Sequence, residues 1–190
     1  MVPRSKWKPP PDPTLRSELL EGDSATIGER VERYRFLREE LGPPAGMLFW
    51  GGLPAMIAFH ELQRSFVEGN LIATVVMSQT FIEHSLGASF SMSGEDSVVK
   101  SGFANLTRTS HDRDHISADV AGALDELRRM RNAYSHPQPG FTARSYMARL
   151  KEYGYDPEEL AVRDARRAIE IVADYLRDQS PNWTPENQDD

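Results

Sequence analysis

The chain has 190 residues, of which 39% are hydrophobic, 27% charged and 9% aromatic, and this composition excludes a disordered or collagen-like chain. It contains no cysteine, which excludes disulfides, thiolate metal ligands and a cysteine nucleophile. The formal net charge of −7 argues against nucleic-acid binding by the surface as a whole.

The two ends of the chain are expected to be tails. Residues 1–24 are proline-rich and lack apolar periodicity, which favours a flexible, extended segment, and residues 181–190 are polar and acidic. The start has no apolar signal-peptide core, and the longest apolar stretch, 45–58, is shorter than the about 20 residues of a membrane span. We therefore expect a cytoplasmic protein without a membrane partner.

Residues 25–180 are expected to form one helical domain. Apolar residues recur there at spacings of three and four, and no hairpin signal or repeat is present. Prolines, glycines and capping residues delimit the segments. The predicted helices are 25–41, 53 or 54 to 67, 71–90, 98–106, 117–134 and 157–179. The fold class is therefore all-α, a bundle of about five to six helices.

Two charged residues continue apolar rows. Arg131 follows Leu124 and Leu127 on the helix 117–134, and Glu83 occupies a similar position on the helix 71–90. A charge inside a bundle must be paired or functional. We expect the two side chains to approach within salt-bridge distance or to share a water; a purely structural ion pair and exposure at a helix end remain alternatives.

The segment 128–151 carries a local charge of +6, because six basic residues occur there without any Asp or Glu. Such segregation of charge is typical of phosphate binding. Tyr134, Phe141 and Tyr146 lie between the basic residues and could stack on bases. The alternative is a solvated basic face.

Residues 131–136 read Arg-Asn-Ala-Tyr-Ser-His and are followed by Pro137. This motif resembles that of the HEPN (higher eukaryotes and prokaryotes nucleotide-binding) superfamily, an arginine and a histidine at the end of a helix. The preceding helical segment 124–130, Phe81-Ile82-Glu83-His84 on an earlier helix and residues 164–168 on a closing helix are similar to the family's arrangement. The resemblance covers about residues 60–178.

The resemblance implies a helical bundle that pairs into a homodimer, with the motifs of both subunits around one cleft. It also implies a metal-independent endoribonuclease without a cofactor, as in HEPN toxins and defence effectors. His136 would transfer protons, Arg131 would grip the phosphate, and Asn132 and Glu83 would support them. The residues expected to bind the substrate are Arg128, Tyr134, Arg144, Tyr146 and Arg149.

The partners expected are RNA, a second copy of the chain, and an antitoxin or another regulatory protein. One departure bears on the antitoxin, because toxins modified by nucleotidyltransferase antitoxins have a tyrosine two residues after the histidine and this chain has Gln138. The alternative function is a catalytically silent HEPN-like module that binds a nucleotide or a protein. A metal site at His111-Asp112-Arg113-Asp114-His115 is a weaker alternative, because no third well-spaced ligand accompanies the two histidines.

Overall fold

The computed structural model describes residues 13–42, 51–136, 145–154 and 156–180. Within these ranges the chain forms eight α-helices and no strand, so the predicted all-α class is confirmed and the predicted five to six helices are too few. The helices are α1 (Pro13–Leu41), α2 (Gly52–Val67), α3 (Leu71–Met92), α4 (Asp96–Val99), α5 (Phe103–Asp112), α6 (Ala118–Ser135), α7 (Tyr146–Glu152) and α8 (Pro157–Gln179).

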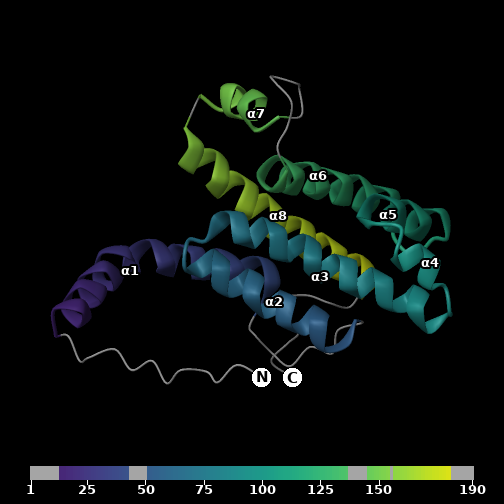
Figure 1. The fold of residues 1–190 in the computed structure, drawn as a ribbon, viewed down its shortest axis with the longest axis horizontal. Coiled ribbons are helices and arrows are strands. Elements are labelled where there is room, and N and C mark those ends of the chain that lie inside the picture. The colour runs from purple at the N-terminus through teal and green to yellow at the C-terminus, as the bar shows by residue number, and fades with distance from the viewer. Residues whose placement is uncertain (1–12, 43–50, 137–144, 155, 181–190) are drawn as a thin grey trace, which may run out of the picture.

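Helix α3 lies at the centre of the bundle (Figure 1). It contacts α2, α4, α5, α6 and α8, so it is covered on several sides. The short helices α4 and α5 pack near its C-terminal end, whereas α7 contacts α8 beyond the end of α6. The end of α6, where the basic motif lies, is therefore placed beside α7 and α8.

The core is assembled from the long helices. The sequence places Ile72, Gln79 and Leu86 on the row of α3 that also carries Glu83. This predicted row is wrong in part, because Gln79 and Leu86 are buried but Ile72 is 50% exposed. Because neighbours contact α3 on several sides, its buried residues fill adjoining rows instead of one stripe. The largest fully buried side chains of the bundle include Leu62, Phe66, Phe81, Ile82, Phe90, Leu124, Leu127, Leu160, Ile169 and Ile171.

Helix α1 begins at Pro13, so the expectation of an extended tail up to residue 24 is wrong for the residues described. Proline suits a first helical turn, and Leu, Arg and Glu, which favour helices, dominate the segment that follows. Residues 14–29 are all exposed, so no buried face produces a row of apolar residues that would predict a helix there. Residues 1–12 and 181–190 lie outside the described residues.

The predicted helix 98–106 is replaced by two helices, α4 and α5. Gly102, with a φ of 85°, separates α4 from α5, because this backbone conformation interrupts a right-handed helix. Helix α5 then continues to Asp112, so His111 and Asp112 of the weaker metal-site alternative belong to a helix. Helix α7 was not predicted; it starts where the Ser145 hydroxyl accepts a hydrogen bond from the Ala148 N–H at 3.2 Å, and it buries only Leu150.

None of the helices in the described part of the chain has both the length and the apolar composition that a membrane span requires.

Candidate functional site at the end of helix α6

The C-terminal end of α6 is positioned by the apolar residues before it. Ser117 caps the helix, accepting a hydrogen bond from the Val120 N–H at 3.3 Å, and Leu124 and Leu127 are fully buried. Arg131 continues this row at the edge of the bundle, where it is half-buried. The side chain is thereby anchored at its base and open to solvent at its tip.

His136 ends the helix in an extended conformation, with φ −129° and ψ 134°. The sequence predicts this departure, because a following proline disfavours helical geometry, and the prediction is confirmed. The His136 backbone N–H still donates to the Asn132 carbonyl at 3.1 Å. The exposed imidazole is therefore held one turn beyond Arg131 and Asn132.

The three motif side chains touch one another. Nη1 of Arg131 lies 2.8 Å from Nε2 of His136 and 3.2 Å from Oδ1 of Asn132. A guanidinium can only donate hydrogen bonds, so this contact is a hydrogen bond when Nε2 of His136 is the acceptor. The site thus combines a planar cation, suited to a phosphate, with an imidazole, a side chain that can accept and donate protons.

A buried carboxylate fixes the surroundings of this motif. Asp164 on α8, 3% exposed, accepts a hydrogen bond from the Tyr134 hydroxyl at 2.9 Å and one from Nη1 of Arg149 at 2.6 Å. Nη2 of Arg149 donates to the other carboxylate oxygen. One acid therefore ties together the end of α6, helix α7 and the first half of α8.

The electrostatics of the cluster favour this arrangement. Burial raises the pKa of Tyr134 far above its ordinary value, and the charge of Asp164 adds to the rise. Burial acts against the charge of Arg149, but the hydrogen bonds and charge of Asp164 outweigh it and raise the Arg149 pKa. The rings of Tyr134 and Tyr146 lie 5.6 Å apart, at 55°. Three residues expected to bind substrate therefore contact protein groups instead.

Glu83 does not join this site. No ion pair between Glu83 and Arg131 occurs among the described residues, so the expected ion pair is wrong. The end of α6 is held at Asp164, whereas Phe81, two residues before Glu83 on α3, packs on Tyr175 with ring centroids 6.2 Å apart. Asp164 and Tyr175 are eleven residues apart on α8. The contact that holds the end of α6 and the contact beside Glu83 are therefore about 16 Å apart along that helix.

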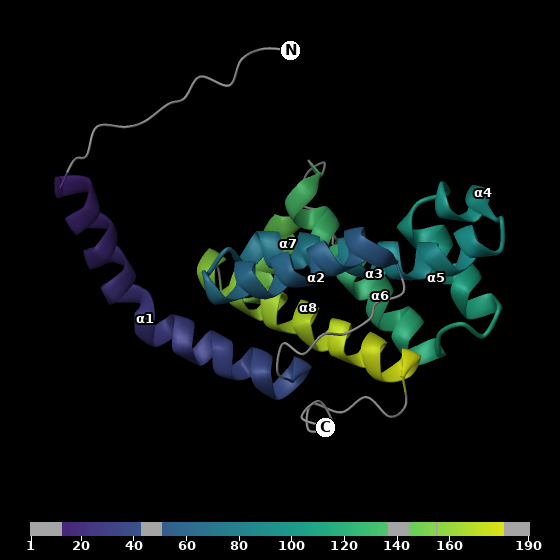
Figure 2. The same cartoon turned by 90° about the horizontal axis from the view of Figure 1, so that it is seen from below.

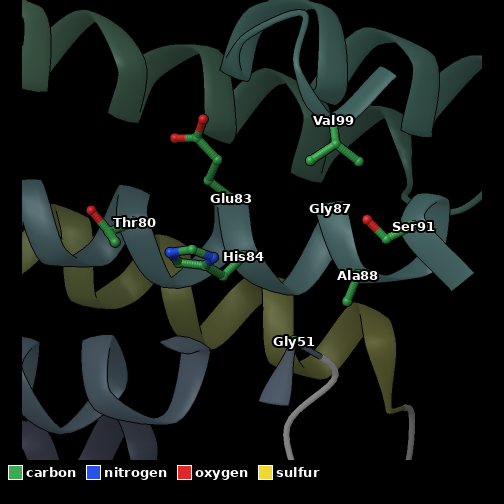
Figure 3. A pocket seen from close by; sticks show the side chains of 8 residues that line it. All are labelled: Gly51, Thr80, Glu83, His84, Gly87, Ala88, Ser91 and Val99. Atoms are coloured by element: carbon green, nitrogen blue, oxygen red, sulfur yellow. The ribbon is translucent and has the colours of Figure 1, made fainter. Parts of the chain in front are cut away.

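Glu83 instead lines a separate cavity of about 410 Å³ with Thr80, His84, Gly87 and Val99. Figure 3 shows that the Glu83 and His84 side chains leave α3 in different directions. Their proximity in sequence therefore does not make them a catalytic pair.

The basic segment is less cationic in the fold than in the sequence. Asp125, one turn earlier on α6, pairs with Arg128 at 2.6 Å and with Arg129 at 3.3 Å. Asp164 neutralises Arg149 from another helix. Arg144 lies outside the described residues. Acidic residues that flank the segment or fold against it therefore offset part of the predicted charge.

The arginines of α8 that support the family resemblance have structural contacts. The Arg166 guanidinium lies 4.8 Å from the centroid of the Phe36 ring on α1, in a cation–π arrangement. Arg167 donates to Glu126 on α6 at 2.9 Å. These side chains attach α8 to its neighbours and are not gathered at the motif.

Sequence reasoning missed Asp164 as a residue of this site, although a signal was present. Asp164 follows Ala161 by three residues and precedes Ala168 by four, so it stands on the apolar row of α8. The rule that singled out Arg131 and Glu83, a charge on an apolar row, applies equally here. Its partner Arg149 could not be found by periodicity, because it lies on the short helix α7.

No family model matches the chain, and neither a curated protein nor a solved structure does. Within the described ranges, no group of three His, Asp or Glu side chains gathers as a metal site would require. The function is therefore inferred from the side chains at the end of α6.

Proposed function

We propose that this chain is a metal-independent endoribonuclease of the HEPN type, acting as a homodimer in the role of a toxin or defence effector. The observation that carries the proposal is the contact of 2.8 Å between Nη1 of Arg131 and Nε2 of His136. It brings the two residues of the motif together at an exposed helix end, with Asn132 beside them. RNA is the proposed substrate, and an antitoxin or regulatory protein is a proposed partner.

In the proposed mechanism the RNA supplies its own nucleophile. A phosphate of the substrate replaces His136 as the hydrogen-bond partner of the Arg131 guanidinium, which offers a planar pair of donors for two phosphate oxygens. This exchange frees Nε2 of His136 to accept the proton of the 2′-hydroxyl as that oxygen attacks the phosphorus. The 5′-oxygen leaves with a proton, and the RNA keeps a 2′,3′-cyclic phosphate.

Each active site needs a base and an acid. One neutral His136 cannot be both in the same step, so the His136 of a second subunit, protonated, is proposed to donate to the leaving oxygen. Asn132 is proposed to orient the hydroxyl or the phosphate through its side-chain amide. Glu83 has no place in this scheme, because it lines another cavity.

A catalytically silent module that binds a nucleotide or a protein is the second candidate. The observation that favours it is the same contact, because Nε2 of His136 is already occupied by Arg131 and cannot accept a proton until Arg131 moves. Both candidates need the guanidinium for binding an anion. Only the endoribonuclease needs the freed imidazole.

Cleavage of single-stranded RNA by the purified chain in EDTA tests the proposal. We expect fragments ending in a 2′,3′-cyclic phosphate and a 5′-hydroxyl, absent with His136→Ala. His60→Ala is the matched control, since His60 is another exposed histidine, on α2. RNA binding without cleavage by the wild-type chain would favour the silent module, and equal activity in the His136→Ala variant would refute the assignment.

A further inference from the structure

The N-terminal half of α1 extends beyond the rest of the bundle, as Figure 2 shows. The contacts of α1 with other helices begin at Arg30, which pairs with Glu68 at 2.6 Å, and at Arg33, whose Nε donates to the Val67 carbonyl at 3.0 Å. Residues 14–29 are exposed throughout. An isolated helix as short as residues 14–29 is only marginally stable in water, and Gly22 and Gly28 lower its stability further.

A row of large apolar side chains runs along one face of α1. Leu20, Ile27 and Tyr34 are seven residues apart, and Val31 lies one turn after Ile27. Seven residues are nearly two helical turns, so all four side chains share a face. Leu20 is 57% exposed, Ile27 54%, and Val31 and Tyr34 50% each. Val31 and Tyr34 remain exposed although they lie in the half of α1 that packs on the bundle. We call these four residues the α1 stripe.

We propose that the α1 stripe is the contact surface for the α1 stripe of a second copy of this chain, in an antiparallel helix pair. The seven-residue spacing is that of helices that pair through an apolar seam. Ile27 and Val31 would pack against the same two residues of the partner at the centre of the pair. Leu20 would lie beside the partner's Tyr34.

The charges beside the stripe agree with this orientation. Glu21 precedes Gly28 by seven residues and Arg35 follows it by seven, so all three share the face that flanks the stripe. A two-fold axis at Gly28 therefore places Glu21 opposite the partner's Arg35, and Arg35 opposite the partner's Glu21. This contact would add to the pair that Arg35 makes with Glu32 of its own helix at 2.7 Å. Residues that flank a seam in this way set the orientation of paired helices. Gly28 has open space around it, so the helices can approach there.

The first test is the mass of the full chain by light scattering at micromolar concentration. We expect a dimer, and a monomer for the double variant Ile27→Glu with Val31→Glu, with unchanged helix content by circular dichroism. The matched control places two glutamates on another exposed apolar pair, Leu53→Glu with Ile57→Glu on α2, and should remain a dimer. A monomeric wild-type chain, or a dimer that survives the α1 changes, overturns the proposal.

The second test is a charge exchange that fixes the orientation. Glu21→Arg alone and Arg35→Glu alone should each raise the dimer dissociation constant by about ten-fold, because attraction becomes repulsion at two symmetric places. The two changes together should restore the wild-type constant. Loss without restoration in the double variant overturns the antiparallel register.

The third test uses the absence of cysteine from the chain. Gly28→Cys should form a disulfide-linked dimer under mild oxidation, because the two copies of residue 28 meet at the axis. Leu20→Cys should not, since an antiparallel pair holds the two copies of residue 20 about 24 Å apart. The opposite pattern overturns the proposal. None of the three tests uses RNA. A monomeric wild-type chain would overturn both this proposal and the proposed dimeric active site, whereas a dimer that survives the α1 changes overturns this proposal alone.

Discussion

The guanidinium of Arg149 on α7 binds the buried carboxylate of Asp164 on α8 through two hydrogen bonds, and Nη1 lies 2.6 Å from one carboxylate oxygen. The same oxygen accepts from Tyr134, which stands between Arg131 and His136 in the sequence. Asp164, 30 residues further along the chain than Tyr134, therefore contacts the helical turn that carries the motif. Asp164 is a positioning residue in this arrangement, because it acts on the motif through Tyr134.

Asp164→Asn should destabilise the fold by about 3 to 5 kcal/mol, because it leaves the Arg149 charge in a protected site without its counter-charge. The measurement is the free energy of unfolding by chemical denaturation. The control is Asp174→Asn on the same helix, whose pair with Arg177 at 3.0 Å is largely exposed and should cost at most about 1 kcal/mol. Equal losses in the two variants would show that the Asp164 cluster contributes no more than a surface ion pair.

The stability of the fold should fall as pH rises above about 10, the ordinary tyrosine pKa. Burial raises the pKa of Tyr134 and of Tyr175 well above that value, so the folded state keeps two protons that the unfolded state loses. The loss is at most about 1.4 kcal/mol per pH unit for each tyrosine, reduced by solvent screening at the half-buried Tyr134.

Tyr134→Phe should make this alkaline decline shallower, which denaturation at several pH values between 9 and 11 would detect. An unchanged slope in Tyr134→Phe would mean that its hydroxyl titrates alike in both states.

The long helices that bury one face could be predicted from the sequence. The predicted segments 117–134 and 157–179 agree with α6 and α8 to within about one residue, because their apolar rows and their capping residues point to the same boundaries. The first half of α1 was missed for the opposite reason. It is exposed throughout, so no burial pattern marks it.

The site was predictable where a local rule decides the geometry. His136 is extended because Pro137 follows it, and this needs no knowledge of the fold. The contact of Arg131 with His136 is local as well, since both residues stand at the end of α6. Whether Arg131 meets Glu83 was not predictable, because that depends on where two helices cross. The row that carries Glu83 indicated that an acid faces the bundle, but only the packing of α6 and α3 on α8 separates Glu83 from Arg131.

Asp125→Asn should strengthen RNA binding, because Asp125 neutralises the adjacent Arg128 and Arg129. The expected gain is roughly two- to five-fold in affinity at low salt, the scale of one surface charge. The dependence of log affinity on log salt should steepen by up to about 0.7, the value for one added contact with single-stranded RNA. Asp174→Asn changes the net charge equally on another helix, so an equal gain there would indicate a general charge effect.

Arg131→Lys should separate binding from cleavage. Lysine keeps the positive charge that attracts the phosphate but lacks the planar pair of donors, so RNA affinity should change little while the cleavage rate falls by about 10²-fold or more. Arg129→Lys is the matched control on the same helix, since Arg129 is exposed and contacts Asp125 instead of His136. Cleavage in single-turnover assays with EDTA, together with filter-binding affinities, measures both quantities.

An RNA with a 2′-deoxy sugar at the cut site should bind and remain intact, because the attacking oxygen is missing. Cleavage of that substrate, or products with a 5′-phosphate, would show that water attacks the phosphorus and that the proposed mechanism is wrong.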